Sequence, residues 1–283
     1  MIVTTIGERT FPLFEYILTD EAKNRLAPGP GRKEDTFGLG VLDPDGFPMG
    51  AIAIKCYPPT AEVISLYVME PLRRMGVGSQ LMFEAVTSVM TLPGIDELIV
   101  PYSERPGKDE LTSFFQGIGM DIIDVGADYK IKAADALSSS KLKYKLRQKA
   151  LAEPWDNLKT GAKKMLFNEG AGLKDYYEQG KLRMDLVYAA MGEGYKSLRG
   201  CIAMAEEGDE LILAWLRAEN SPILMMELLD CVRQRISENG EQDKVIRIPT
   251  INPASDAMVQ DLFGKKLEVE YYSKRVVFDF EEE

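Results

Sequence analysis

Hydrophobic and polar residues in the first half of the chain fall into short runs whose spacing changes between strand-like and helix-like. The strand-like runs are rich in β-branched residues and are separated by proline, glycine and aspartate. They predict strands over residues 1–5, 36–42, 50–57, 61–68, 97–101, 121–125 and 129–133. Apolar residues at helical spacing predict helices over residues 11–26, 76–90 and 109–117. The predicted order is therefore β, α, β, β, β, α, β, α, β, β.

The second half repeats most of this order at a spacing of roughly 145 residues, as expected for a tandem repeat of one fold. Its predicted strands are residues 186–191, 198–205, 210–216, 244–248, 267–272 and 275–280, and its predicted helices are 222–236 and 254–263. Compact apolar runs are typical of parallel strands, and runs joined by short turns are typical of antiparallel pairs. We predict an α/β (α+β) protein of two domains, residues 1–134 and 135–283, each with a mixed, mostly antiparallel sheet flanked by helices.

A cationic segment lies between the two predicted domains. Three serines, Ser138 to Ser140, precede residues 141–149, in which five of nine residues are lysine or arginine. The serines can cap a helix with an apolar face, but the strict alternation fits a strand equally well. A basic segment can bind an anionic partner, and we interpret this one as a solvated connector.

The composition is that of a globular protein with two cores. The 283 residues are 45% hydrophobic and 28% charged. The net charge of −11 argues against a nucleic-acid partner, because phosphate contacts require a basic surface, and it is compatible with a cationic acceptor such as an amine. No apolar run approaches the ~18 residues that cross a membrane, so we expect no membrane partner.

Cysteine usage and the first ten residues favour a cytoplasmic location. Cys56, Cys201 and Cys231 lie far apart in apolar runs without metal-ligand spacing, and we interpret them as reduced core residues. Residues 1–10 lack the basic and apolar regions of a secretory signal. The sequence leaves the oligomeric state open, and a homodimer is compatible with it.

The chain contains no histidine, and this absence restricts its chemistry. Triads and dyads that use imidazole as the base are excluded, as are metal sites with imidazole ligands, and we expect no metal. Any acid or base must be a carboxylate, a tyrosine, a lysine, a cysteine or water. Acyl transfer from a thioester is among the reactions that lose least from this restriction.

A glycine-rich turn joins the predicted strand that ends at Val68 to the predicted helix that follows. A helix N-terminus has unpaired N–H groups and partial positive charge, and Gly76 and Gly78 let an anion approach closely. Leu81 stands where a dinucleotide fingerprint has its third glycine, and no lysine follows as in a P-loop. By itself the turn fits a phosphate site and a tightly packed strand–helix turn equally well.

The surrounding run, residues 66–81, resembles the acetyl-CoA motif of the GNAT superfamily of N-acetyltransferases. Arg73, Gly76 and Gly78 match the three defining positions of the motif, and the predicted order of elements is also that of the family. The resemblance implies that acetyl-CoA is the co-substrate, with its pyrophosphate on the turn and its pantetheine arm along the strand. The cofactor-binding residues that it implies are Leu66, Tyr67, Val68, Arg73, Arg74, Met75, Gly76, Val77, Gly78 and Ser79.

The resemblance also directs attention to the groups that would transfer protons. Phe115 stands where many members have a tyrosine that serves the leaving thiol, and Tyr102 is the nearest alternative hydroxyl. The other interpretation of Tyr102 is an aromatic ring that closes the edge of the sheet. Glu62 is the only acid on the strand that precedes the turn.

The second half resembles a GNAT fold that has lost the pyrophosphate loop. The corresponding segment, residues 217–224, has no glycine, and Glu219 would repel a phosphate. We therefore expect one acetyl-CoA per chain, bound by the first domain. The predicted function is an acetyl-CoA-dependent N-acetyltransferase acting on a primary amine of a small molecule, an amino acid or a peptide. The alternative is a non-catalytic acyl-CoA-binding or protein-interaction module.

Overall fold

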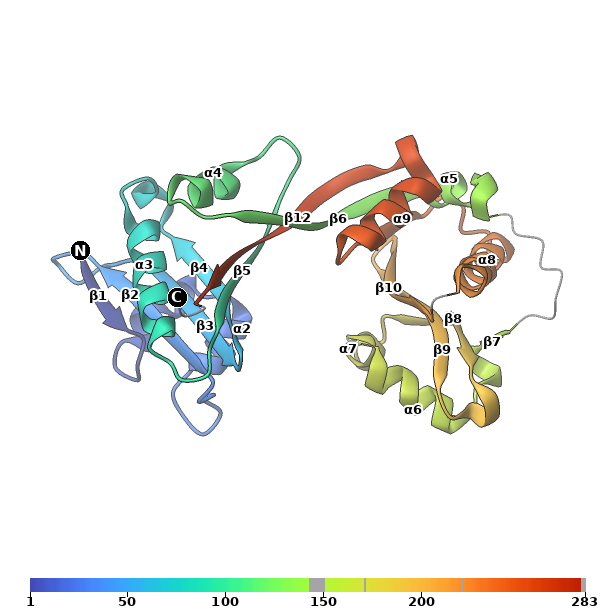
Figure 1. Cartoon of the computed structure of the whole chain (residues 1–283), viewed down its shortest axis with the longest axis horizontal. Coiled ribbons are helices and arrows are strands. Elements are labelled where there is room, and N and C mark those ends of the chain that lie inside the picture. Colours follow the sequence, from blue (N-terminus) through green and yellow to red (C-terminus); the bar gives the residue numbers. More distant parts are fainter. Residues whose placement is uncertain (143–150, 171, 220, 281–283) are drawn as a thin grey trace. The chain divides into compact units, whose positions relative to one another are not determined.

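The computed structural model describes residues 1–142, 151–170, 172–219 and 221–280 (Figure 1). Most of the predicted connector, residues 143–149, lies outside this part of the chain. Its first cation, Lys141, forms an ion pair with Asp261. Among the described residues, no helix is both long enough and apolar enough to cross a membrane.

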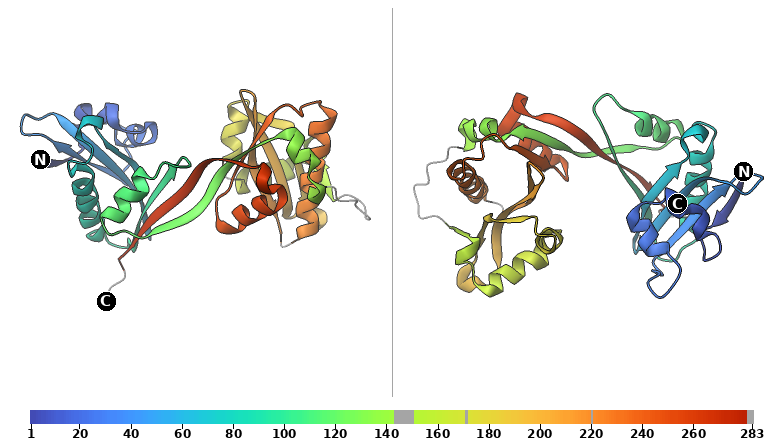
Figure 2. Two further views of the ribbon diagram at one scale, coloured as in Figure 1. Left: turned by 90° about the horizontal axis from the view of Figure 1, so that it is seen from above. Right: turned by 180° about the vertical axis from the view of Figure 1, so that it is seen from behind.

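The chain forms two compact units, which can be followed from further directions in Figure 2. One unit contains residues 1–124 and 273–280, and the other contains residues 125–272. Two long strands, β6 (Ile122–Lys132) and β12 (Glu268–Asp279), each begin in one unit and end in the other. The predicted domains 1–134 and 135–283 stay a prediction, and the compact units differ from them in both of these strands.

The sheet of the first unit has the strand order β1-β2-β3-β4-β5-β12. Strands β1 to β4 pair antiparallel, whereas β4 and β5 pair parallel. One hydrophobic cluster contains residues of α3 and α4, and another contains residues of α1 and α2. The elements are β1 (Ile2–Thr5), α1 (Phe11–Phe14), η1 (Glu15–Ile17), α2 (Asp20–Leu26), β2 (Thr36–Leu42), β3 (Pro48–Tyr57), β4 (Thr60–Val68), η2 (Glu70–Leu72), α3 (Val77–Met90), β5 (Glu97–Glu104) and α4 (Glu110–Gly117).

The sheet of the second unit has the strand order β12-β6-β11-β10-β9-β8-β7. Strands β10 and β11 pair parallel, and the pairs β6–β11, β9–β10, β8–β9 and β7–β8 are antiparallel. The elements are α5 (Ala133–Ser138), η3 (Ser140–Leu142), β7 (Ala152–Pro154), η4 (Trp155–Asn157), α6 (Thr160–Glu169), α7 (Leu173–Glu178), β8 (Leu182–Met191), η5 (Glu193–Tyr195), β9 (Leu198–Glu207), β10 (Glu210–Ala218), α8 (Pro222–Glu238), β11 (Val245–Pro249), α9 (Pro253–Phe263) and η6 (Gly264–Lys266).

The two units repeat one arrangement of strands and helices. In each, three antiparallel strands lead into a helix and then into a parallel strand, β2-β3-β4-α3-β5 in the first and β8-β9-β10-α8-β11 in the second. The parallel pairing covers three residues in both, 60–62 with 97–99 and 210–212 with 245–247. The predicted fold class, mixed and mostly antiparallel sheets flanked by helices, is confirmed.

The predicted closing pairs of strands are wrong in both halves. Residues 121–125 and 129–133 were expected as two strands, but the single strand β6 runs through Gly126. A Cβ on Gly126 would lie 2.6 Å from the carbonyl oxygen of Thr250, so this glycine permits a close approach rather than a turn. Likewise, one strand, β12, replaces the expected pair 267–272 and 275–280. Helices α6 and α7 and strand β7 were not predicted.

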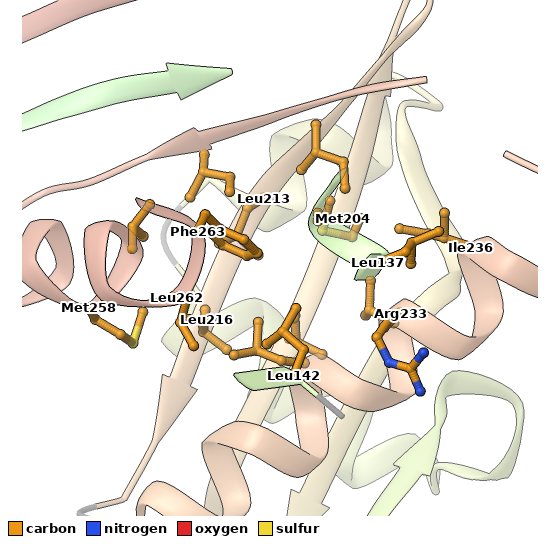
Figure 3. A pocket seen from close by; sticks show the side chains of 17 residues that line it. Leu137, Leu142, Met204, Leu213, Leu216, Arg233, Ile236, Met258, Leu262 and Phe263 are labelled. Carbon is orange, nitrogen blue, oxygen red and sulfur yellow. The ribbon is translucent and has the colours of Figure 1, made fainter. Parts of the chain in front are cut away.

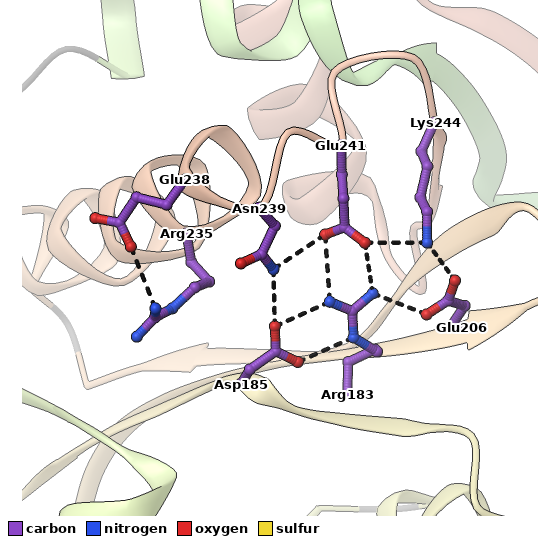
Figure 4. Close-up of polar contacts among 8 residues, drawn as sticks. All are labelled: Arg183, Asp185, Glu206, Arg235, Glu238, Asn239, Glu241 and Lys244. Carbon is purple, nitrogen blue, oxygen red and sulfur yellow. Dashed lines mark hydrogen bonds and ion pairs between the residues drawn. The ribbon is translucent and has the colours of Figure 1, made fainter.

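A network of charged side chains holds the end of the second unit where α8 leads into β11 (Figure 4). Arg183 of β8 donates hydrogen bonds to Asp185, Glu206 and Glu241 over 2.8–3.2 Å. Lys244 pairs with Glu206 and Glu241, and Asn239 donates to Asp185. Every carboxylate in this network has a cationic or amide partner.

Candidate functional site

Strands β4 and β5 separate after a short stretch of pairing. Their register covers only Thr60–Glu62 with 97–99, and β4 continues to Val68. A register shift against β3 falls at Ile64, where the hydroxyl of Thr19 donates to the Ile64 carbonyl at 3.1 Å. Within the described residues, the part of β4 that holds Leu66, Tyr67 and Val68 therefore has no register partner on β5. An extended ligand can pair with such a strand edge.

The predicted loop connects this free end of β4 to α3. The loop passes through η2 and then through Arg74 and Gly76, whose φ angles of 65° and 84° lie in the left-handed region. Gly76 is the N-cap residue of α3 and has no side chain that can accept from the helix. The first-turn N–H groups, those of Val77, Gly78 and Ser79, thus have no side-chain cap among the described residues. Their dipoles favour an anion at this position.

The two glycines of the loop serve different purposes. A Cβ on Gly76 would meet nothing within 4 Å, so this residue is required for its left-handed conformation. A Cβ on Gly78 would lie 3.3 Å from the ring of Phe114 and 3.6 Å from Cγ2 of Val68. Gly78 is therefore the point at which β4, α3 and α4 come together, and the absence of a side chain leaves the backbone accessible.

Arg73 ties the loop to the end of β4. Its Nε donates to the carbonyl oxygen of Val68 at 3.3 Å, and its guanidinium lies 5.9 Å from the centre of the Tyr67 ring. It also forms a long ion pair of 3.8 Å with Glu70. The side chains of Arg73, Arg74 and Met75 are exposed at the rim of the loop. The structure thus brings the ten predicted cofactor-binding residues together on one strand end, one loop and one helix turn.

Tyr102 lies on β5, and its hydroxyl is 3.1 Å from the hydroxyl of Thr112 on α4. Its ring packs against that of Phe115, with 5.0 Å between the ring centres. Burial raises the pKa of Tyr102 above its usual value. Phe115 itself is fully buried in the core beneath α4. Tyr102 therefore keeps both of its predicted interpretations, since its hydroxyl is bonded and its ring is packed.

Glu104, which was not predicted, ends β5 and caps the first turn of α4. Its carboxylate accepts from the N–H groups of Leu111 and Thr112 at 2.7 and 2.9 Å and from the Thr112 hydroxyl at 2.5 Å. Lys274 of β12 adds a charge 3.5 Å away. Burial alone would raise the pKa of Glu104, but these hydrogen bonds and the lysine outweigh it and lower that pKa. Glu104 is therefore a buried carboxylate that stays ionised at neutral pH.

The corresponding helix end in the second unit is already occupied. Ser221 caps α8 by accepting from the N–H of Leu224 at 3.2 Å, and Pro222 has no N–H to offer. Behind it, α8, α9 and the sheet enclose a cavity of about 60 Å³ with an apolar lining (Figure 3). Leu137, which precedes the connector, and Leu142, which lies within it, are part of this lining. No group of side chains suited to a metal ion occurs among the described residues.

Comparison with known proteins identifies the family of one segment and the fold of the chain. The model of the acetyltransferase (GNAT) family matches residues 8–104. A search of curated proteins gave no match. A tandem GNAT protein from the clavulanic acid biosynthesis pathway superposes with a TM-score of 0.56 at 14% identity, covering 100% of both chains.

Two further solved structures have the same fold. A GCN5-related N-acetyltransferase from Anabaena variabilis gives a TM-score of 0.55 at 11% identity, covering 99% of this chain and 73% of that one. Eis1 from Mycobacterium abscessus gives a TM-score of 0.51 at 13% identity, covering 99% of this chain and 74% of that one. Residues 8–104 thus belong to the acetyltransferase (GNAT) family, and the chain as a whole has the fold of tandem GNAT proteins.

Proposed function

We propose that this protein is an acetyl-CoA-dependent N-acetyltransferase that acts on a primary amine of a small molecule, an amino acid or a peptide. The observation that carries the proposal is the N-terminus of α3, which has no side-chain cap among the described residues and follows the end of β4 that has no register partner on β5. The helix N-terminus suits an anionic group of a ligand, and the strand edge suits an extended arm of the same ligand. The pyrophosphate and the pantetheine of CoA supply both.

The first unit offers the groups that such a ligand requires. Met75 to Ser79 would direct backbone N–H groups at the pyrophosphate, while Arg73 and Arg74 add positive charge at the rim. The backbone of Leu66 to Val68 would pair with the pantetheine. Bound there, acetyl-CoA supplies an activated acetyl group as a thioester. In the second unit Ser221 already caps the N–H of Leu224 and Pro222 has no N–H, so the first turn of α8 offers fewer free N–H groups, which supports a single site per chain.

The chain's own residues would then assist the transfer. An N–H group on the part of β4 that has no register partner on β5 can stabilise the negative oxygen that develops on the acetyl carbonyl. An alkyl amine has a pKa near 10 and must lose a proton to attack, and we propose Glu62 to accept it. Glu62 is the last β4 residue paired with β5 and accepts from the Tyr57 hydroxyl at 2.9 Å. Tyr102 is proposed as the hydroxyl that serves the departing thiol.

A second candidate function, a non-catalytic acyl-CoA-binding module, is favoured by one observation. Phe115 is buried where many family members carry a tyrosine, so the usual hydroxyl is missing from α4. Both candidates bind CoA, and turnover separates them.

The test combines calorimetry with a thiol assay on the whole chain. Titration with acetyl-CoA is expected to show one site per chain, and a panel of small amines, amino acids and peptides is expected to release free thiol. Tight binding without thiol release across the panel would favour the binding module. Absence of acetyl-CoA binding would overturn both candidates, and two sites per chain would contradict the assignment to the first unit alone.

A further inference from the structure

Four side chains that face the same region of the first unit come from three separate elements. Tyr102 and Glu104 lie on β5, Thr112 lies on the first turn of α4, and Lys274 lies on β12. The Thr112 hydroxyl is at their centre, 2.5 Å from Glu104, 2.8 Å from the Lys274 ammonium and 3.1 Å from the Tyr102 hydroxyl. The side chains of Glu104 and Lys274 are 5% and 19% exposed, so the charges interact away from bulk water.

The chemistry of these groups restricts the direction of each hydrogen bond. An ionised carboxylate only accepts and an ammonium only donates, whereas a threonine hydroxyl donates once and accepts twice. Thr112 therefore donates to Glu104 and accepts from Lys274, which leaves one acceptor position for Tyr102. The single hydrogen of Thr112 has two acceptors in reach, the Glu104 carboxylate and the Tyr102 oxygen. It can turn to Tyr102 if the phenol loses its proton.

We propose that Thr112, Glu104 and Lys274 form a positioning network that holds the Tyr102 hydroxyl at the acyl-transfer site. In this network Glu104 positions Thr112, and Thr112 and Lys274 ease release of the Tyr102 proton to the departing thiolate. The inference rests on the proposed function. In the step concerned, the Tyr102 O–H bond breaks and an S–H bond forms. The phenolate accepts the Thr112 hydrogen beside the Lys274 charge. It regains a proton from the attacking nitrogen, which loses one as it becomes a neutral amide, or from water.

In this network the hydroxyl of Tyr102 takes the place of the one that is missing at Phe115. The ring of Tyr102 packs directly on the ring of Phe115, so β5 supplies a hydroxyl next to the position where α4 lacks one. Lys274 reaches this site from the last strand of the fold, and it belongs to the first unit although the residues just before it, 268–272, belong to the second. The second half of the sequence thus contributes a charged group to the site of the first.

The first test measures the pKa of Tyr102 in the protein without any ligand. With ¹³Cζ-labelled tyrosine, the Tyr102 signal is assigned by its loss in Tyr102→Phe and is then titrated by NMR. The charged groups that act on this phenol include Glu104 on β5 and Asp124 on β6, which raise its pKa, and Lys274 on β12 lies 3.5 Å from Glu104. Glu104→Gln removes a negative charge and should lower the pKa of Tyr102. Thr112→Val removes the hydrogen bond that stabilises the phenolate and should raise it.

Opposite shifts of the Tyr102 pKa distinguish the network from a structural effect, because loosening of α4 would shift this pKa in the same direction in both variants. Lys274→Met should raise the pKa of Tyr102, and Lys274→Arg should restore it towards the wild-type value. The matched control is Lys266→Met, which removes a lysine paired with Asp135 in the second unit and should leave the Tyr102 titration unchanged. Shifts of one sign in Glu104→Gln and Thr112→Val, or no shifts, would overturn the proposal.

The second test measures turnover and binding together. Because a positioned general acid contributes factors of about 10²–10⁴, Thr112→Val and Lys274→Met should each lower kcat at least about tenfold. The Kd for acetyl-CoA should stay within about twofold, because the charge-assisted hydrogen bonds proposed for the pyrophosphate lie on the loop and on α3. An unchanged kcat in both variants would overturn the network and leave the proposed function standing. A wild-type protein that binds acetyl-CoA without turnover would overturn the proposed function, and the catalytic role of the network with it.

Discussion

Val276 of β12 is fully buried in the same hydrophobic cluster as Leu98 of β5, although the two residues lie far apart in the sequence. Phe278 and Phe280 pack against this cluster as well. The core of the first unit therefore includes side chains that follow the whole second unit in the sequence.

A fragment of residues 1–134 is therefore expected not to fold, because it lacks the strand that completes its sheet and core. In the whole chain, Val276→Ala should lower the free energy of unfolding by about 2 kcal/mol, through lost burial and the cavity that remains. Chemical denaturation followed by circular dichroism measures this difference. Arg275→Ala, at the exposed neighbouring position, is the matched control and should cost much less. A cooperatively folded fragment 1–134 would show that β12 is dispensable.

Gly78→Val should abolish binding of acetyl-CoA to the first unit. A β-branched side chain would occupy the space in which the phosphate must approach the α3 N–H groups. The charge-assisted hydrogen bonds lost are worth about 1.5–3 kcal/mol each, which takes the affinity out of calorimetric range. Because the ring of Phe114 is 3.3 Å from the new Cβ, thermal unfolding must be measured in parallel.

The control for this change is Gly161→Val. Gly161 lies in the first turn of α6, and a Cβ at this position would meet nothing within 4 Å. The variant therefore places the same side chain on the first turn of a helix, away from the proposed site, and it should bind acetyl-CoA as the wild type does. Gly78→Ala supplies an intermediate case if the valine variant is unstable. Undiminished affinity in a folded Gly78→Val protein would show that the cofactor lies elsewhere.

The charged network around Arg183 should make the free energy of unfolding depend on pH. Hydrogen bonds from Lys244 and Arg183 lower the pKa of Glu206. At Asp185 and Glu241 burial acts in the opposite direction, but hydrogen bonds from Arg183 still bring the pKa below its usual value. A lowered folded-state pKa stabilises the protein above the unfolded-state pKa, and this stabilisation is lost as the pH falls through the folded-state value.

Arg183→Met should accordingly reduce the free energy of unfolding at pH 7 and flatten its decline below about pH 4.5, near the ordinary pKa of these carboxyl groups. Denaturation curves between pH 7 and pH 3 measure both effects. Arg199→Met, which changes an arginine of β9 outside the network, is the control. Parallel pH profiles for wild type and Arg183→Met would refute the role given to these pairs.

Val232→Ile should stabilise the second unit. Val232 lines the cavity of about 60 Å³ between α8, α9 and the sheet, so the added methylene enters empty space. Burial of one methylene group contributes about 0.8 kcal/mol, and cavity filling commonly gives about 0.5–2 kcal/mol. Val187→Ile is the matched control, because Val187 is buried in another cluster and does not line the cavity. There the same addition should destabilise by overpacking, and thermal unfolding of both variants measures the difference.

The structure of the loop between β4 and α3 was predictable from sequence because its requirements are local. A strand end, two glycines and a helix start determine the backbone over a dozen residues, and β4 and α3 appear within one residue of their expected bounds. Gly76 at φ 84° and the open first turn of α3 are direct consequences of those residue types. Local requirements are visible in a single sequence.

The closing strands and the Tyr102 network were not predictable in this way. Gly126 looks like a turn residue until Thr250 is placed against it, and Ser273 with Lys274 looks like a break until β12 is paired as one strand. Glu104 and Lys274 meet only because β5 and β12 are neighbours in the sheet. No spacing along the chain encodes a contact between residues 104 and 274.

The position of β12 also bears on how the protein is made. During synthesis, β1 to β5 leave the ribosome before any residue of the second unit, yet Val276 and its neighbours are the last part of the first unit to appear. N-terminal domains usually fold first as they emerge. Here we expect the first unit to remain incomplete, with the edge of β5 exposed, until translation has passed residue 280. The first unit therefore stays incomplete for the whole time that the second unit is being built.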